Sequence, residues 1–172
     1  MKKTAAAAVL TAALFSTGVN AGAVELERLT PEEAPVEQCI ASGKGVFWTL
    51  QRRQISRRGQ TMLDGVIVAS EESGLQLKVI QRRDGDHRVA VGPDGKPGRP
   101  VAELEKHVKE MRREQMIPYR LDMGKEIVAV YAPHGAQLKA SPRKGGALID
   151  LEIKEDVRKH REPIEPFAPM AR

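Results

Sequence analysis

The sequence predicts an α+β domain, in which a meander of short, mainly antiparallel strands forms a sheet and helices pack on one of its faces. Three observations lead to this prediction. The segment from 100 to 116 has apolar residues at helical spacing, several shorter segments are alternately or continuously apolar, and turn-forming residues separate these segments at hairpin distances. We expect the domain to span residues 24–155.

The first 23 residues have the three parts of a secretory signal peptide. Lys2 and Lys3 precede an apolar run from 5 to 15, and small residues follow. The run is much shorter than the ~20 apolar residues that cross a bilayer, so we expect cleavage rather than anchoring. Cleavage after Ala21 and cleavage after Ala23 both fit. The mature protein is therefore expected to be periplasmic or secreted, with no transmembrane segment.

The composition of the mature chain limits its partners. Removing 23 of the 172 residues leaves enough chain for one domain with a sizeable core. Loss of Lys2 and Lys3 reduces the 28 basic residues to 26, against 23 acidic residues, so the mature protein is only mildly basic. Aromatic residues make up 3% of the chain, which argues against an aromatic platform for single-stranded nucleic acid. We do not expect a nucleic-acid partner.

A single cysteine, Cys39, excludes an internal disulfide. In an oxidising compartment such a thiol is either buried and inert or pairs with another chain. Cys39 falls beside Ile40 in a predicted helix, which favours burial, and the sequence leaves both possibilities open.

The first half of the mature chain predicts one short helix followed by strands. Pro35 begins a helix that runs to about Ser42, and Gly43 ends it. Residues 46–50 are bulky and apolar on both faces, which is typical of a buried strand. Residues 66–69 predict a second strand, and the alternation over 75–79 predicts a half-buried one.

The hairpin around Asp84-Gly85 allows a prediction of register. A two-residue turn at these positions would pair Val79 with Ala90 and place Val89 and Val91 on the opposite face from Val79. A loop of three or five residues would pair Val79 with Val91 and gather the apolar side chains on one face. We therefore expect the odd-length loop, although Asp-Gly is a strong signal for a two-residue turn.

The main helix is predicted over about 100–116, because its apolar residues recur at steps of three and four. We expect Lys106, Lys109 and Arg113 to be exposed on its other face. Ile117-Pro118 is expected to end the helix, since the residue before proline avoids the α region. The residues of the stripe, expected to be buried, are Val101, Leu104, Val108 and Met111.

After the main helix, residues 127–131 are apolar on both faces and predict an inner strand. Residues 141–146 predict a loop, and the alternation over 147–153 predicts a strand with one buried face. From 156 to 172 the chain is charged and then proline-bearing, so we expect an extended or disordered tail.

No catalytic or metal-binding motif is complete. The four histidines are far apart in the sequence, and none has the spacing of a zinc site. Ser141-Pro142-Arg143-Lys144 matches Ser-x-x-Lys, but the companion motifs of that chemistry are missing. The sequence therefore predicts no metal, no cofactor and no catalytic group. His107 is expected to be a packed, semi-buried residue of the main helix. The histidines are His87, His107, His134 and His160.

Arginines form the strongest local bias. Four of them fall between 51 and 60 with no acidic residue nearby, and two more stand at the tip of the following hairpin. Guanidinium groups bind carboxylates and phosphates through two parallel hydrogen bonds. We therefore interpret these residues as a candidate surface for an anionic partner, with a solvated loop as the alternative. The candidates are Arg52, Arg53, Arg57, Arg58, Arg82 and Arg83.

These observations favour a non-enzymatic, exported binding or accessory protein of the bacterial envelope. Its partner would be another envelope protein or an anionic envelope component, for example in a secretion, conjugation or surface-assembly system. The alternative hypothesis is a small periplasmic hydrolase whose site no motif reveals, with His87, His134 and nearby carboxylates as candidates.

Overall fold

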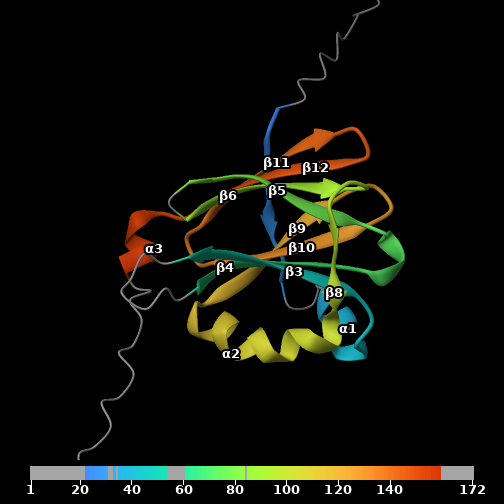
Figure 1. Ribbon diagram of the computed structural model, residues 1–172, viewed down its shortest axis with the longest axis horizontal. Coiled ribbons are helices and arrows are strands. Elements are labelled where there is room, and N and C mark those ends of the chain that lie inside the picture. Colours follow the sequence, from blue (N-terminus) through green and yellow to red (C-terminus); the bar gives the residue numbers. More distant parts are fainter. Residues whose placement is uncertain (1–21, 31–32, 34, 54–60, 84, 160–172) are drawn as a thin grey trace, which may run out of the picture.

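A computed structural model describes residues 22–30, 33, 35–53, 61–83 and 85–159. Their strands form two six-stranded antiparallel sheets stacked face to face (Figure 1). The first sheet, in spatial order, contains β1 (Val24–Glu25), β11 (Gln137–Arg143), β12 (Gly146–Glu152), β6 (Asp86–Gly92), β5 (Gln76–Arg83) and β7 (Lys96–Pro97). The second contains β2 (Glu27–Arg28), β9 (Met116–Asp122), β10 (Ile127–Pro133), β4 (Thr61–Ala69), β3 (Val46–Arg53) and β8 (Arg99–Pro100).

The prediction of a mainly antiparallel β structure with few helices is confirmed. The strands form two stacked sheets, however, where the sequence predicted one. The second sheet packs against the first on one face and against helices on the other. A short chain with this many apolar strands can bury them only by adding a layer, because an exposed apolar sheet face would remain in water.

Helices α1 (Pro35–Ser42) and α2 (Glu105–Arg113) lie on the face of the second sheet that is turned away from the first (Figure 1). A 3₁₀ turn, Val101–Leu104, leads into α2, so the segment predicted as one helix over 100–116 begins as a tighter turn. The helix also ends earlier than predicted, because Gln115 has a φ of 50° and Met116 already begins β9.

The predicted apolar stripe of this segment is buried most deeply at its start. Val101 and Leu104 are buried, whereas Val108 and Met111 are half-buried. Lys106, Lys109 and Arg113 are exposed, as predicted.

The second sheet is the central layer, and its inner strands are buried on both faces. Every residue of β4 after Thr61 is buried, and all of β10 after Ile127 is buried. The segments predicted as strands buried on both sides, 46–50 and 127–131, lie in β3 and β10 of this sheet. Side chains of β3 alternate between the two cores: Trp48 faces the first sheet and Phe47 faces the helices.

The chain changes sheets four times, and at two of these changes, one at each edge of the sandwich, a single residue separates the two strands. Leu26 separates β1 from β2, and Gly98 separates β7 from β8. A Cβ atom at Gly98 would lie 2.6 Å from the Cβ of Val46, so only glycine fits where the backbone passes this closely. Each edge is thus partly closed by a short strand pair that belongs to both sheets.

The register of the β5–β6 hairpin differs from the predicted one. Arg83 pairs with Asp86, so two residues connect the strands, and the predicted loop of three or five residues is wrong. The predicted pair of Val79 with Val91 is wrong as well: Val79 pairs with Val89 and Leu77 pairs with Val91, although these apolar residues do share one face. A β-bulge between Val79 and Gln81 supplies the extra residue that the prediction had assigned to the loop.

Several other segments differ from the predictions. Residues 116–122 form β9, which the sequence did not indicate, and the predicted loop over 141–146 begins inside β11. The predicted tail starts as helix α3 (Glu155–Lys159), in which Val157 packs against the inter-sheet core. The rest of the predicted tail and nearly all of the predicted signal peptide lie outside the described residues. Cys39 is half-buried, whereas the sequence favoured a fully buried thiol.

The layered core makes a testable prediction about Leu104. This side chain is 1% exposed between the 3₁₀ turn and the central sheet, so Leu104→Ala leaves a cavity there. We expect urea denaturation to show a loss of about 2–5 kcal/mol in the free energy of unfolding. Lys106→Ala, two residues away and exposed, should change it by less than about 0.5 kcal/mol. Equal effects of the two substitutions would contradict this placement of the turn.

Candidate functional site

Arg52 and Arg82, two of the arginines singled out in the sequence, come from different sheets and act on the same buried carboxylate. The Nε atom of Arg52, in β3, lies 3.8 Å from Oδ2 of Asp64. Arg82, in β5, lies within the electrostatic influence of both Asp64 and Arg52. The tip of the β5–β6 hairpin reaches the same place, since a Cβ atom at Gly85 would lie 2.5 Å from a terminal nitrogen of Arg52.

Asp64 owes its position to a β-bulge. Leu50 pairs with Gly65, but Gln51 pairs with Leu63, so Asp64 is an extra residue in β4. Leu63 faces the helices, and regular alternation would turn Gly65 to that side as well. The extra residue restores Gly65 to the inter-sheet side, where an added Cβ atom would lie 3.4 Å from Leu151, and the Asp64 side chain is completely buried. Bulges commonly redirect one side chain in this way.

His87 in the first sheet completes the cluster. Its Nε2 atom lies 2.9 Å from Oδ2 of Asp64, and the histidine is 3% exposed. A carboxylate only accepts hydrogen bonds, so Nε2 carries the proton and donates it. The Nδ1 atom is buried with no hydrogen-bond partner among the described residues. The Asp64–His87 bond therefore joins the two sheets through their interior.

Among the described residues of the cluster, two guanidinium groups accompany one carboxylate. Asp64 forms an ion pair with Arg52 and lies near enough to Arg82 to raise its pKa. Burial lowers the pKa of Arg82 below its ordinary value; Asp64 opposes this shift, and the like charge of Arg52 adds to it. A second anion at this place would relieve the repulsion between the two arginines. The site is therefore suited to a carboxylate or phosphate supplied from outside.

The other candidates have different outcomes. Arg53 and Arg83 are the last residues of β3 and β5, although their side chains are not described. Arg57 and Arg58 lie outside the described residues. His134 is exposed after β10 and is not part of the cluster.

His107 has the packed, partly buried position expected from the sequence. Its ring meets the ring of Phe47 edge-on, with centroids 5.9 Å apart. The guanidinium of Arg99 lies over the same phenylalanine, 4.6 Å from the ring centroid. A cation over an aromatic face is held there by the ring's negative potential.

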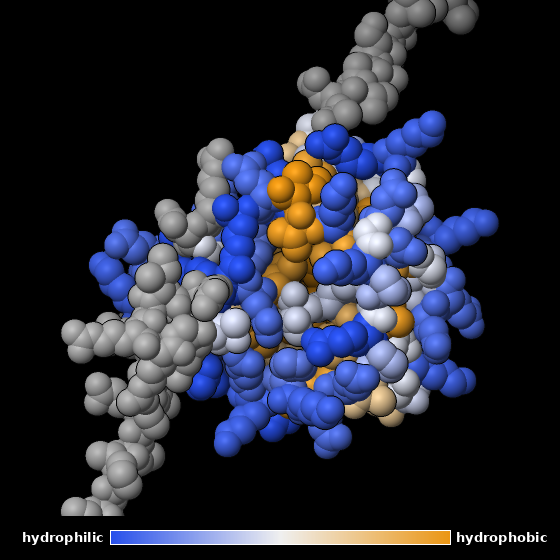
Figure 2. Space-filling model, viewed as in Figure 1, coloured by the Kyte–Doolittle hydropathy of each residue, from blue (hydrophilic) through white to orange (hydrophobic). Residues whose placement is uncertain are grey.

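An open groove leads toward the arginines along one edge of the sandwich. We call it the edge groove; it has a volume of about 720 Å³ and lies between β3 and β5, beside the β7–β8 crossing. Figure 2 shows apolar side chains gathered in a hollow on this face of the molecule, over β5 and toward β3. Its apolar walls are formed by Phe47, Trp48, Leu77 and Val79.

The edge groove exists because the crossing strands are short. β7 pairs with β5 only at Gln76 and Leu77, and β8 pairs with β3 only at Val46 and Phe47. In the described part of the chain, no strand pairs with this edge of β5 along Lys78–Ile80. Val79 and Ile80 are consequently 47% and 54% exposed, although both are β-branched apolar residues.

Charged side chains along the edge groove are mostly basic. Lys78, Lys96 and Arg99 line it, against one acidic residue, Asp94. The groove also includes Gln51, the residue before Arg52, and Val79, three residues before Arg82. An apolar groove with basic walls thus ends near the arginine-rich cluster.

Sequence reasoning found Arg52 and Arg82 but missed Asp64. It treated Asp64-Gly65 as the residues before a strand, whereas both lie inside β4. One signal was available: Asp64 interrupts an otherwise apolar stretch from Met62 to Ala69, and an acid within such a stretch needs a buried partner.

The buried cluster predicts unequal effects of two Asp→Asn substitutions. Asp64→Asn removes the only negative charge that we place between Arg52, Arg82 and His87. We expect a loss of roughly 3–5 kcal/mol in the free energy of unfolding, measured with urea. The matched variant is Asp150→Asn, which breaks a partly exposed pair with Arg88 at 2.6 Å and should cost less than about 1 kcal/mol. A smaller loss for Asp64→Asn than for Asp150→Asn would show that the cluster does not hold the sheets together.

Comparison with known proteins adds no relative. No family model matches the chain, and neither a curated protein nor a solved structure is detectably similar to it. Over the described ranges, no helix is long and apolar enough to cross a membrane. Within the same ranges, no three His, Cys, Asp or Glu side chains are grouped so that they could hold a metal ion.

Proposed function

We propose that this protein is an exported, non-enzymatic binding module of the bacterial envelope, which holds an extended, acidic segment of a partner protein in the edge groove. One observation carries the proposal: an open apolar groove with basic walls lies between two sheet edges, and its lining includes Gln51, the residue before Arg52 of the buried cluster. The partner's backbone would pair with a sheet edge, and its acidic side chain would meet the arginines.

An extended peptide fits this groove better than a folded surface does. Sheet edges without a neighbouring strand present backbone donors and acceptors, and an added strand satisfies them. Alternate side chains of that strand would pack on Val79 and Trp48, which line the groove. The basic residues Lys78, Lys96 and Arg99 favour a segment with negative charge.

Export rests on the signal-peptide pattern of the sequence. Cleavage after Ala21 or after Ala23 leaves β1 whole, since this strand begins at Val24. A periplasmic or secreted location would place the groove among the proteins of the envelope.

The hydrolase alternative has one observation in its favour. Asp64 and His87 form the hydrogen-bonded pair that many acid–base sites use. The His87 side chain, however, is only 1% exposed, so a substrate would reach it only after the sheets separate. Burial therefore favours a structural role for this pair and a binding role for the arginines around it.

Peptide binding tests the proposal. A fluorescein-labelled peptide Asp-Val-Thr-Val-Thr-Val should bind the mature protein, and Lys-Val-Thr-Val-Thr-Val should bind much more weakly, as measured by fluorescence anisotropy. Arg82→Gln should weaken the acidic peptide about tenfold, which is the contribution of one charge-assisted contact. Added salt should weaken it further, because exposed charges are screened beyond ~8 Å at physiological ionic strength.

Two controls make this result specific. Arg112→Gln removes an exposed arginine on α2, away from the groove, and should leave the affinity unchanged. Val79→Asp places a carboxylate inside the groove and should abolish binding of the acidic peptide. Equal affinity of the parent, Arg82→Gln and Val79→Asp proteins for this peptide would refute the proposal.

Export has its own test. When the full sequence is expressed in a Gram-negative host, mass spectrometry of the periplasmic fraction should find a chain that begins at Gly22 or Val24. Recovery of only the uncleaved chain, in the cytoplasm or the membrane, would contradict the proposed location while leaving the peptide experiment unaffected.

A further inference from the structure

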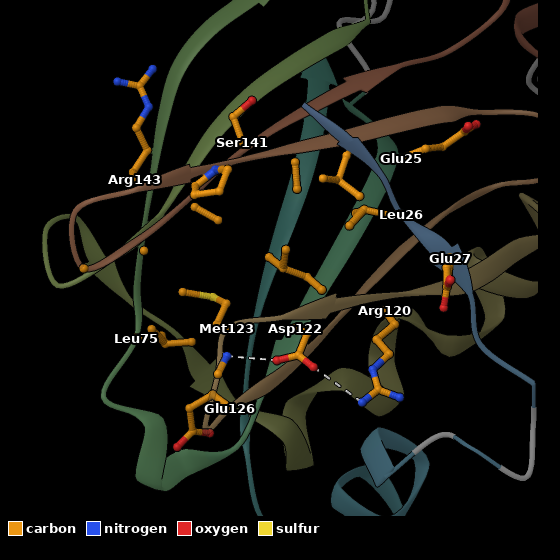
Figure 3. Close-up of a pocket in the computed structure, with 18 residues that line it drawn as sticks. Glu25, Leu26, Glu27, Leu75, Arg120, Asp122, Met123, Glu126, Ser141 and Arg143 are labelled. Atoms are coloured by element: carbon orange, nitrogen blue, oxygen red, sulfur yellow. Dashed lines mark hydrogen bonds and ion pairs between the residues drawn. The ribbon is translucent and has the colours of Figure 1, made fainter. Parts of the chain in front are cut away.

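A second hollow lies at the opposite edge of the sandwich from the edge groove. We call it the inter-sheet cavity; it has a volume of about 860 Å³. Its walls come from β1, β2, β9, β11 and the start of β12, with the β9–β10 turn at its mouth (Figure 3). In both sheets, these edge strands lie at the far end of the strand order from β7 and β8.

The cavity exists because small side chains face each other across this part of the sandwich. Stacked sheets lie ~10 Å apart, and side chains from both must fill the gap. Elsewhere the first sheet supplies Leu77, Val89 and Val91, but at this edge it supplies Ala140 and Ala147. The inter-sheet core therefore continues into a space that the protein's own side chains do not fill.

The floor of the inter-sheet cavity is apolar. Leu26 and Leu121 are buried core residues that also line it, and Leu75 and Met123 pack beside them. Figure 3 shows Leu26 directed toward the open space, whereas Glu25 and Arg143 point away from it. Such a floor favours a hydrocarbon chain over a polar ligand.

The mouth of the inter-sheet cavity is polar and has a negative charge balance. Six charged residues belong to the cavity lining, but Glu25 and Arg143 point away from it (Figure 3). The other four have a formal charge of −2, and two of them, Arg120 and Asp122, form an ion pair at 3.7 Å. Two of the carboxylates are held in place: Asp122 accepts a hydrogen bond from the backbone N–H of Gly124 at 2.9 Å, and Glu126 accepts one from the hydroxyl of Ser70 at 2.9 Å. The charged residues are Glu25, Glu27, Asp122, Glu126, Arg120 and Arg143.

We propose that the inter-sheet cavity binds a single-chain amphiphile with a cationic head. The alkyl chain would occupy the space beside Ala140 and Ala147, and the head would stay at the acidic mouth. The volume of about 860 Å³ lies within the ~300–1,000 Å³ typical of sites for small molecules. This site is separate from the edge groove and does not depend on the function proposed for it.

Titration calorimetry with alkyltrimethylammonium ions of eight, nine and ten carbons, below their micelle concentrations, tests the proposal. Each added methylene group that enters the cavity should lower the Kd about fourfold. Decyl sulfate, with the same chain and an anionic head, should bind at least tenfold more weakly than decyltrimethylammonium. A Kd that does not change with chain length, or tighter binding of decyl sulfate, would overturn the proposal.

Cavity-filling variants locate the site. Ala147→Leu places a larger side chain in the space meant for the alkyl chain, so it should weaken decyltrimethylammonium at least tenfold. Ala140→Leu, on the neighbouring strand, should do the same and serves as the second test if the first variant does not fold. Ala102→Leu makes the same change at an exposed position of the 3₁₀ turn and should leave the Kd unchanged. Unchanged binding in a folded Ala147→Leu or Ala140→Leu protein would refute this location.

Discussion

Burial of the central sheet on both faces is the constraint on which the rest of the structure depends. β4 and β10 have core packing on either side, so side chains of both parities must be apolar or must have a partner. Asp64 is the exception within β4, and it satisfies this requirement through His87 and Arg52. Because these partners come from both sheets, the polar cluster also fixes how the layers are placed.

Two β-bulges put the polar cluster where it is. In a regular strand each added residue reverses the face to which all later side chains point, so one extra residue changes the chemistry of a whole edge. The bulge at Asp64 turns a carboxylate into the inter-sheet space. The bulge in β5 brings Arg82 opposite His87 while Val79 stays opposite Val89. One bulge in each sheet thus helps to position the residues of the polar cluster.

The crossings β1–β2 and β7–β8 explain the hollows at the two edges of the sandwich. β1–β2 and β7–β8 are only two residues long in each sheet, so each closes a fraction of its edge. Beside β7–β8 the remaining opening is apolar with basic walls, and beside β1–β2 it is apolar with an acidic mouth. Opposite charge at opposite edges suits different occupants, which is why we assign an acidic peptide to one and a cationic amphiphile to the other.

The sequence by itself determined which segments are buried on both faces, where the main helical stripe lies and which arginines form a local excess of charge. These features can be predicted because periodicity and composition depend only on residues that are close together in the sequence. Only the tertiary structure decided that there are two sheets, that the Asp84-Gly85 turn is compatible with the aligned valines, and that residues 116–122 and 141–143 are strands. It also decided the candidate site. Asp64 and His87 are 23 residues apart and belong to different sheets, and their hydrogen bond depends on a bulge and on how the layers stack. Local patterns show that a residue is buried, but the long-range path of the chain selects what it is buried against.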